Sequence, residues 1–295
     1  MPGESGFIRS GYEESSNGLW VKYCTFTMSS RGDNYGSVHL KNSESCTNVE
    51  ITHNRITHTG TSGSTNSSGI ICFGNNSFKI NNNEISGPPM GIYLKHANTG
   101  NSSSVNGEVR NNFVKSTTRR AFFCNFNYIL IENNIFHSDN TGSSDGNVQI
   151  NEDNGGPGGD YNTIRNNTIM CGIQFHRDSG GATNNKFYGN IVGGGKLWKI
   201  HPYGTITDYT TSDYNLFISG TCISRNSTSY SLSTWKSSIR QDAHSLSGTP
   251  TFVGGSAPST IAGYQLASGS LGKGKGVNGA DIGAERADLT GQRGD

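Results

Sequence analysis

The chain is poor in apolar residues, and this scarcity excludes an ordinary globular core. Only 31% of its 295 residues are hydrophobic, whereas glycine alone accounts for 41 positions, and Asn, Ser and Thr are abundant. Charged residues are also scarce, at 15%, so the composition differs from that of a highly charged disordered chain. Low apolar content combined with low charge favours a repetitive β fold, whose apolar core is a thin column.

Other absences disfavour whole classes of partner. No run of about 18 apolar residues exists, so the sequence predicts no membrane-spanning helix. The formal net charge of +1 gives no overall attraction to nucleic acid or to an anionic membrane. The six cysteines are too sparse for a disulfide scaffold and form no CxxC pair, so most are expected to be buried thiols. The N-terminus resembles no signal peptide. We expect an extracellular or virion-associated protein, in a mature, trimmed or viral form.

The organising signal is a recurring phrase: an apolar residue, two further residues, Asn, one residue, and a second apolar residue. It occurs six times, and an earlier copy has Cys24 at the Asn position. The copies span residues 21–26, 51–56, 80–85, 109–114, 131–136, 164–169 and 187–192, at steps of 22 to 33 residues. A fixed phrase with a variable spacing is what stacked rungs with loops of different length produce.

The Asn of each phrase has a specific physical use. A rung must turn sharply between two short strands, and Asn tolerates the left-handed conformation that such a corner needs. When rungs stack, the Asn side chains are expected to form a ladder of amide hydrogen bonds, as in cross-β stacks. The apolar residues on either side are expected to point inward.

A second strand follows each phrase and aligns independently over seven rungs. Its first and third residues are expected inside, and its second and fourth outside, because side chains alternate along a strand. The inward columns are then entirely apolar or Cys, which assigns Cys72 and Cys124 to the core. The seven segments are residues 38–41, 70–73, 92–95, 122–125, 148–151, 173–176 and 198–201.

These repeats predict an all-β fold, a single-stranded right-handed parallel β-helix, with about eight rungs in residues 1–217. Residues 218–295 are irregular and are expected to form a C-terminal capping segment on the same solenoid, giving one domain overall. The rung phrase and the closing stretch resemble the pectate-lyase-like superfamily of parallel β-helix proteins over nearly the whole chain. One departure is the absence of an N-terminal capping helix. We therefore expect either a longer native protein or a cap from another subunit.

The outward columns of the second strand, with the residues beside them, carry the candidate substrate-binding residues. Aromatic side chains there offer flat apolar faces on which sugar rings stack, and cationic side chains form a band that suits an acidic polysaccharide. Outward β residues are also polar simply because they face water, and this plainer interpretation stays open. The expected substrate-binding residues are Lys41, Tyr93, Phe123, Asn125, Phe126, Gln149, Asn151, Gln174, Arg177, Lys199, His201 and Tyr203.

The resemblance implies cleavage of a uronate polymer by β-elimination. In that reaction a base removes the proton α to the uronate carboxyl, while cations or Ca²⁺ stabilise the developing charge. Lys95 is the expected base, because desolvation and neighbouring cations help a lysine to lose its proton. Arg119 or Arg120 is expected to neutralise the carboxylate. The arrangement is similar to the lysine–arginine sites of some alginate and chondroitin lyases, without a complete family motif. The expected acid is one of Tyr93, His96 and His176.

Three further hypotheses remain. Glu152 and Asp153 offer hard oxygen ligands, so Ca²⁺ is the one cofactor that the sequence suggests, and a solvated acidic loop is the alternative. A glycoside hydrolase needs converging carboxylates, for which Glu152, Asp153 and Asp178 are the one plausible set. A non-catalytic glycan-binding, tailspike-like or adhesin-type protein is the third hypothesis. A lyase is expected to be a monomer and a spike a trimer.

Overall fold

The structure is a computed structural model. It describes residues 8–9, 18–29, 35–40, 48–60, 66–74, 77–95, 104–116, 118–139, 148–151, 158–176, 182–194, 199–200, 210–218, 223–225 and 228–285. For Arg9, Ser104, Val105, Asn151, His176, Lys199, Ile200 and Arg225, it describes the backbone alone. No helix in the described ranges is long and apolar enough to cross a membrane.

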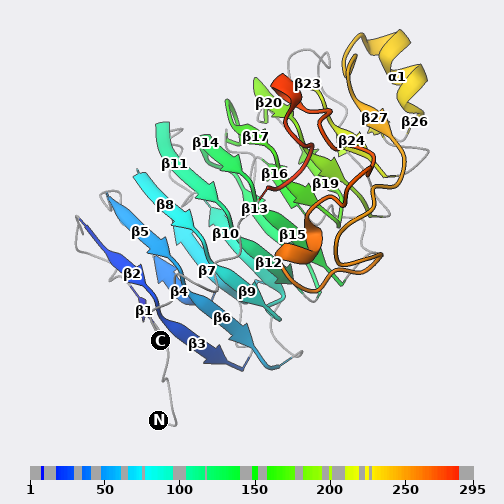
Figure 1. Cartoon of the computed structure of the whole chain (residues 1–295). Helices are drawn as coiled ribbons and strands as arrows, with labels where there is room; N and C mark the ends of the chain where they lie inside the picture. Colours follow the sequence, from blue (N-terminus) through cyan, green and yellow to red (C-terminus); the bar gives the residue numbers. More distant parts are fainter. Residues whose placement is uncertain are drawn as a thin grey trace.

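The chain folds as a right-handed parallel β-helix, as the repeats predicted, and its strands form three sheets that run along the molecule (Figure 1). Within each sheet, neighbouring strands come from successive rungs and pair in parallel, except for the antiparallel pair β25–β26. The ten-stranded sheet consists of β1 (Ile8–Arg9), β4 (Gly36–Leu40), β7 (Ser68–Phe73), β10 (Met90–Lys95), β13 (Phe122–Cys124), β16 (Val148–Asn151), β19 (Ile173–His176), β22 (Lys199–Ile200), β25 (Ile223–Arg225) and β26 (Thr228–Tyr230).

The two other sheets are built from the residues of the Asn phrase and those around it. The eight-stranded sheet holds β2 (Trp20–Lys22), β5 (Val49–Thr52), β8 (Ser77–Asn81), β11 (Ser104–Arg110), β14 (Asn127–Glu132), β17 (Thr163–Arg165), β20 (Asn185–Tyr188) and β23 (Thr210–Asp213). The nine-stranded sheet holds β3 (Thr25–Met28), β6 (Arg55–His58), β9 (Glu84–Ser86), β12 (Phe113–Ser116), β15 (Ile135–Ser138), β18 (Thr168–Ile169), β21 (Ile191–Val192), β24 (Leu216–Phe217) and β27 (Leu246–Ser247).

The register read from the sequence is confirmed strand by strand. The apolar residues that open the phrase pair in one column, as in Ile51 with Ile80 and Val109 with Ile131. The second-strand alignment is also correct, since Ile92 pairs with Ile70 and with Phe122. All these inward columns meet in one buried core, which includes the buried thiols of Cys72 and Cys124. The thin apolar column inferred from composition is therefore the core of the molecule.

The Asn ladder is present and runs almost the full length of the solenoid. The Nδ2 of each phrase Asn donates to the Oδ1 of the next, at 2.9 Å from Asn54 to Asn83 and 3.2 Å from Asn190 to Asn215. Each Nδ2 also donates to a backbone carbonyl of the preceding rung, as in Asn134 to Val109 at 2.8 Å. The ladder residues are Asn54, Asn83, Asn112, Asn134, Asn167, Asn190 and Asn215, all 0% exposed.

The predicted role of these Asn residues in the turn is corrected by one position. The left-handed residue is the one before each ladder Asn, as in His53 (φ 58°), Asn82 (φ 60°) and Asn133 (φ 61°). That corner residue leaves the ladder Asn free to point inward, where its amide replaces the backbone hydrogen bonds that the turn interrupts. Sharp turning and hydrogen-bond replacement are therefore divided between two adjacent residues.

The chain after Phe217 forms a short helix at the end of the solenoid and then an irregular tail. Helix α1 (Leu232–Ile239) places Trp235 in the core at the end of the solenoid. There Asp242 accepts hydrogen bonds from the Trp235 indole and from Asn215, the last ladder Asn. Burial raises the pKa of the Asp242 carboxyl. Residues 250–285, called the tail below, include the short 3₁₀ turns Ala262–Tyr264 and Val277–Gly279.

The tail turns back along the side of the solenoid and lies across the outward face of the nine-stranded sheet (orange to red in Figure 1). Its apolar side chains pack on outward side chains of that sheet in a second buried cluster, which includes Phe252, Tyr264, Leu266 and Ile282 from the tail and Phe113, Ile135, Ile191 and Leu216 from the sheet.

Candidate functional site

Lys95, the predicted base, and Tyr93 lie on the outward side of the ten-stranded sheet. Tyr93 and Lys95 alternate along β10, and Tyr93 pairs across strands with Ile71 on β7 and Phe123 on β13. The amide of Asn125 donates to the Leu94 carbonyl at 3.1 Å, which places Asn125 beside the end of β10. Lys95 is partly exposed. Tyr93, Phe123 and Asn125 are therefore neighbours in space, as the rung alignment predicts.

The outward aromatic side chains of this sheet form a packed series of rings, called the aromatic row below. Ring centroids are 4.9 Å apart for Tyr93 and Phe123, 6.4 Å for Phe73 and Tyr93, and 5.8 Å for His39 and Phe73. At one end of the row, Tyr35 meets His39 at 6.5 Å. The row consists of Tyr35, His39, Phe73, Tyr93 and Phe123.

The expectation that this face is open to solvent is wrong at most of its described positions. Tyr93 and Phe123 are 5% and 4% exposed, so most of their ring surface is withdrawn from any sugar. Alternation along a strand sets the side to which a residue points, but not whether that side is covered. Here the outward apolar side chains Ile71, Met90, Tyr93 and Phe123 cover one another in a cluster of their own. Asn125, Gln149 and Gln174 are likewise buried.

Phe126 is the clearest error among the predicted stacking residues. It is 0% exposed and belongs to the central core, with its ring 5.9 Å from that of Phe78. Its carbonyl accepts a hydrogen bond from the Asn162 side chain at 3.0 Å. The chain turns inward after Asn125, so the alternation counted along the strand does not extend to the next residue.

The two predicted arginines occupy different surroundings. Arg119 donates from Nη1 to the side-chain oxygen of Asn66 at 2.7 Å, so its guanidinium ties together two rungs. Arg120 lies over the Phe123 ring, with the guanidinium carbon 5.5 Å from the ring centroid, in a cation–π contact. Arg120 is therefore the arginine that is joined to the aromatic row beside Tyr93.

Several expected site residues cannot be placed. Lys41, His96, Glu152, Asp153, Arg177, Asp178, His201 and Tyr203 lie outside the described residues, and with them the predicted Ca²⁺ ligands and the hydrolase carboxylates. Asn151, His176 and Lys199 are placed by backbone on β16, β19 and β22, in the predicted register. Among the residues that the structure does describe, no group of three or more His, Cys, Asp or Glu could hold a metal ion.

An exposed pair of tyrosines was not anticipated. The rings of Tyr128 and Tyr161 stack at 5.0 Å with planes 3° apart, and the residues are 45% and 50% exposed. Both have a left-handed backbone and stand three residues before the first apolar residue of an Asn phrase. That shared offset is the signal in the sequence that could have predicted an exposed pair of stacked rings on neighbouring rungs.

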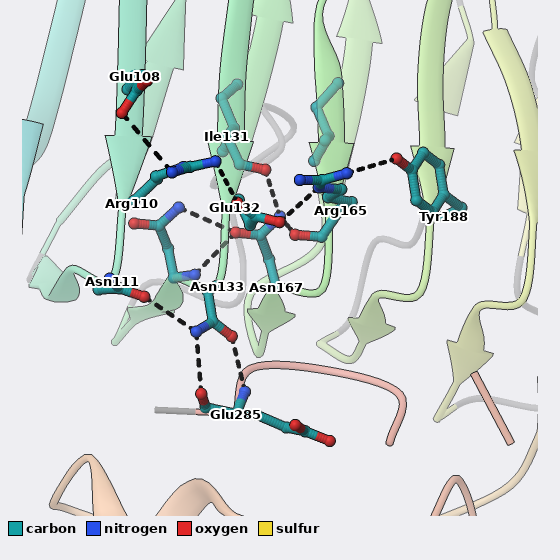
Figure 2. A network of polar contacts seen from close by, with 12 residues as sticks. Glu108, Arg110, Asn111, Ile131, Glu132, Asn133, Arg165, Asn167, Tyr188 and Glu285 are labelled. Carbon is teal, nitrogen blue, oxygen red and sulfur yellow. Dashed lines mark hydrogen bonds and ion pairs between the residues drawn. The ribbon is translucent and has the colours of Figure 1, made fainter. Parts of the chain in front are cut away.

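A second unanticipated feature is a cleft where the tail passes the corner between the eight- and nine-stranded sheets. It encloses about 320 Å³ and is lined by Arg110, Glu132, three corner Asn residues and the tail near Glu285. Figure 2 shows the polar network beside it. Glu132 pairs with Arg110 at 2.9 Å and with Arg165 at 2.5 Å. No sequence pattern predicts this cleft, because the cleft depends on where the tail docks.

Comparisons with protein-family models, with curated proteins and with solved structures gave no match to this chain. The fold and the geometry of the side chains therefore carry the functional argument.

Proposed function

We propose that this protein acts on an acidic, uronate-containing polysaccharide and cleaves it by β-elimination at the outward side of β10. The proposal places it beside the pectate-lyase-like β-helix enzymes, as an extracellular or virion-associated protein whose partner is the polysaccharide. Lys95 is the base, Arg120 binds the uronate carboxylate, and Tyr93 lies beside Lys95 on the same side of the strand.

The observation that carries the proposal is the contrast in exposure around Lys95. Tyr93 and Asn125 beside it are buried and its cross-strand partner Phe73 is partly buried, whereas Lys95 itself is partly exposed at the end of its strand. A partly exposed amine at the edge of a buried surface is accessible to a polymer that lies along the sheet, and a general base must be within reach of the proton that it takes. Arg120 holds its charge one rung away, over the Phe123 ring.

The chemistry then follows from these positions. The Lys95 amine takes the proton α to the uronate carboxyl, and Arg120 stabilises the charge that develops on the carboxylate. The electron pair of the broken C–H bond forms a carbon–carbon double bond as the glycosidic C–O bond breaks. The leaving oxygen takes up a proton, for which Tyr93 is the described candidate and His96 and His176 are the others.

The test is incubation with a panel of uronate polymers, read by the ultraviolet absorbance of the unsaturated uronate product. Wild type is expected to produce this absorbance on at least one polymer. Lys95→Ala is expected to abolish it with the circular dichroism spectrum unchanged. Lys186→Ala, which removes an exposed lysine from the eight-stranded sheet, is the matched control and should keep full activity. Full turnover by Lys95→Ala would remove Lys95 from the mechanism.

The burial of His39, Tyr93 and Phe123 in the aromatic row favours a second candidate function, a non-catalytic glycan-binding or spike-like structural protein. Rings packed against one another stabilise a stalk without being available to a substrate. A spike is expected to be a trimer that resists detergent, and a lyase a monomer, so gel filtration and unheated detergent electrophoresis separate the two. Reducing ends released from a neutral polymer, without absorbance on any uronate, would instead support a glycoside hydrolase.

A further inference from the structure

The cleft beside the tail has the size of a small-molecule site and continues on both sides of the tail. One lobe of about 320 Å³ faces the corner of the solenoid, and another of about 390 Å³ faces tail residues such as Leu266 and Lys273. Both lobes are lined by Asp281 and Glu285. Small-molecule sites span roughly 300–1,000 Å³, so each lobe can hold a ligand of one or two rings.

The walls of the cleft are held in place by hydrogen bonds within the protein. Asn133 clamps the tail by donating to the Glu285 carbonyl at 2.9 Å and accepting from the Glu285 amide at 2.7 Å (Figure 2). Asp281 accepts from Lys273 and from the Gly274 amide. Gly283, at φ 97°, brings the tail so close that an added Cβ would lie 2.6 Å from the Ile191 side chain. Such pre-organisation lowers the entropy cost of binding.

The charges in the cleft are largely neutralised before any ligand arrives. Glu132 is paired with two arginines, and Asp281 with Lys273. The Glu285 carboxylate accepts a hydrogen bond from the Asp281 amide, and the residue is exposed. Three carboxylates and two cations line the two lobes, so the remaining charge is slightly negative. This balance disfavours an anionic ligand and leaves carboxylate and amide oxygens as acceptors.

We propose that this cleft binds a neutral, hydroxyl-rich saccharide, at a site separate from the outward face of the ten-stranded sheet. Hydroxyl groups both donate and accept, which matches carboxylate oxygens and the amides of Asn111 and Asn166, two rungs apart. Leu266 and Ile282 line the other lobe but are only 7% and 1% exposed, so polar groups make most of the contacts that a sugar finds there. The proposed site differs in charge preference from the uronate site and does not depend on it.

The experiment is saturation-transfer NMR on the full chain with neutral trisaccharides of glucose, mannose and galactose, and with a uronate trisaccharide at equal concentration. At least one neutral trisaccharide is expected to bind, and the uronate trisaccharide is expected not to bind in the cleft. Ala280→Trp fills the cleft from an exposed position that lines it, and should weaken binding about tenfold or more, which is over 1.4 kcal/mol.

Val277→Trp is the matched control, because Val277 is also exposed in the tail but does not line either lobe. The affinity of Val277→Trp for the neutral trisaccharide should stay within about twofold of that of wild type. The proposal is overturned if no neutral trisaccharide binds, if Ala280→Trp binds as tightly as wild type, or if the uronate trisaccharide competes for the cleft. The Lys95→Ala variant should bind the neutral saccharide unchanged, which keeps this outcome distinct from that of the lyase proposal.

Discussion

Part of the outward face of the nine-stranded sheet and part of that of the ten-stranded sheet are buried, but by different means. On the nine-stranded sheet, Phe113, Ile135 and Leu216 point away from the core and are 7%, 1% and 0% exposed, because the tail packs over them. On the ten-stranded sheet, Tyr93 and Phe123 are equally buried among side chains of their own face. A third face, on the eight-stranded sheet, carries charged pairs instead.

The difference shows what an outward apolar residue means in a solenoid. An apolar stripe on a sheet surface must be covered, since leaving it in water costs about 25 cal/mol per Å². The cover can come from a distant segment, as for the nine-stranded sheet, or from neighbours on the same face. If both kinds of cover stabilise the fold equally, removing a buried ring from either face should lower the free energy of unfolding by the same amount.

Breaking the internal ladder should have the largest effect, because the ladder links successive rungs through buried hydrogen bonds at the corner between the eight- and nine-stranded sheets. The Asn134 side chain makes four hydrogen bonds, two to Asn112 and one each to Val109 and Asn167. Asn134→Leu leaves buried donors and acceptors without partners, so we expect a loss of about 4 kcal/mol or more in the free energy of unfolding. Urea unfolding followed by circular dichroism measures it.

The control for the ladder variant separates the two roles at the corner. Asn82→Gly changes a left-handed residue beside the ladder, in a conformation that glycine adopts readily, so it should cost less than about 1 kcal/mol. If Asn82→Gly proved as costly as Asn134→Leu, the turn rather than the amide ladder would be the source of the stability.

The second prediction compares the two covered faces directly. Phe123→Ala on the ten-stranded sheet and Phe113→Ala on the nine-stranded sheet remove rings of similar burial. Each is expected to lower the free energy of unfolding by about 3 kcal/mol, the usual cost of a buried ring. A loss below about 1 kcal/mol for Phe123→Ala alone would mean that the ten-stranded face is open in solution.

How far the sequence could predict this molecule depends on the periodicity of each part. The ladder Asn residues and the inward columns repeat from rung to rung, so the sequence alone predicts their register. The left-handed residue was misplaced by one position because its identity varies, from His53 to Asn82 to Gly189. Each of the six copies of the phrase has Asn at the ladder position, whereas the left-handed residue before it is not the same in all copies.

The covers were not predictable, for a physical reason. Outward residues such as Tyr93 and Ile135 have no intrinsic exposure, which is set by whatever packs over them. The tail has no repeat, and its docking on Phe113 joins segments more than 130 residues apart in the chain. The cleft near Glu285 exists only because of that docking, so the candidate site was predicted in part and the cleft not at all.

The third prediction concerns His58, a buried histidine that links a strand of the nine-stranded sheet to one of the ten-stranded sheet. His58 on β6 shares a 3.1 Å hydrogen bond with Ser37 on β4, and burial lowers its pKa to about 4 from 6.5. The folded state therefore favours the neutral ring, while the unfolded chain takes up a proton below pH 6.5. Stability is complete above that pH and falls as the pH drops towards 4, by on the order of 3 kcal/mol.

Urea unfolding of wild type and His58→Gln between pH 7 and pH 4 measures this linkage. The variant should have a flatter dependence, with a residual slope from His137, whose pKa is also lowered by burial and by Lys115. Parallel curves for the two proteins would show that His58 protonation is not what destabilises the junction of the two faces at low pH.

The smallest effect is expected on the uncovered face of the eight-stranded sheet. Glu50 on β5 pairs with Lys22 and Lys79 from the neighbouring strands, and its hydrogen bond to Lys22 lowers the pKa of the carboxyl. These groups remain partly hydrated, so Glu50→Gln should cost less than about 1 kcal/mol. The loss should shrink further in about 1 M salt, where charges are screened within ~3 Å. The Phe123 ring contributes to stability through apolar burial and not through charge. The same salt should therefore leave the cost of Phe123→Ala unreduced. A loss of about 3 kcal/mol for Glu50→Gln that persisted in salt would place this third face under a cover as well, and the contrast between charged and covered faces would fail.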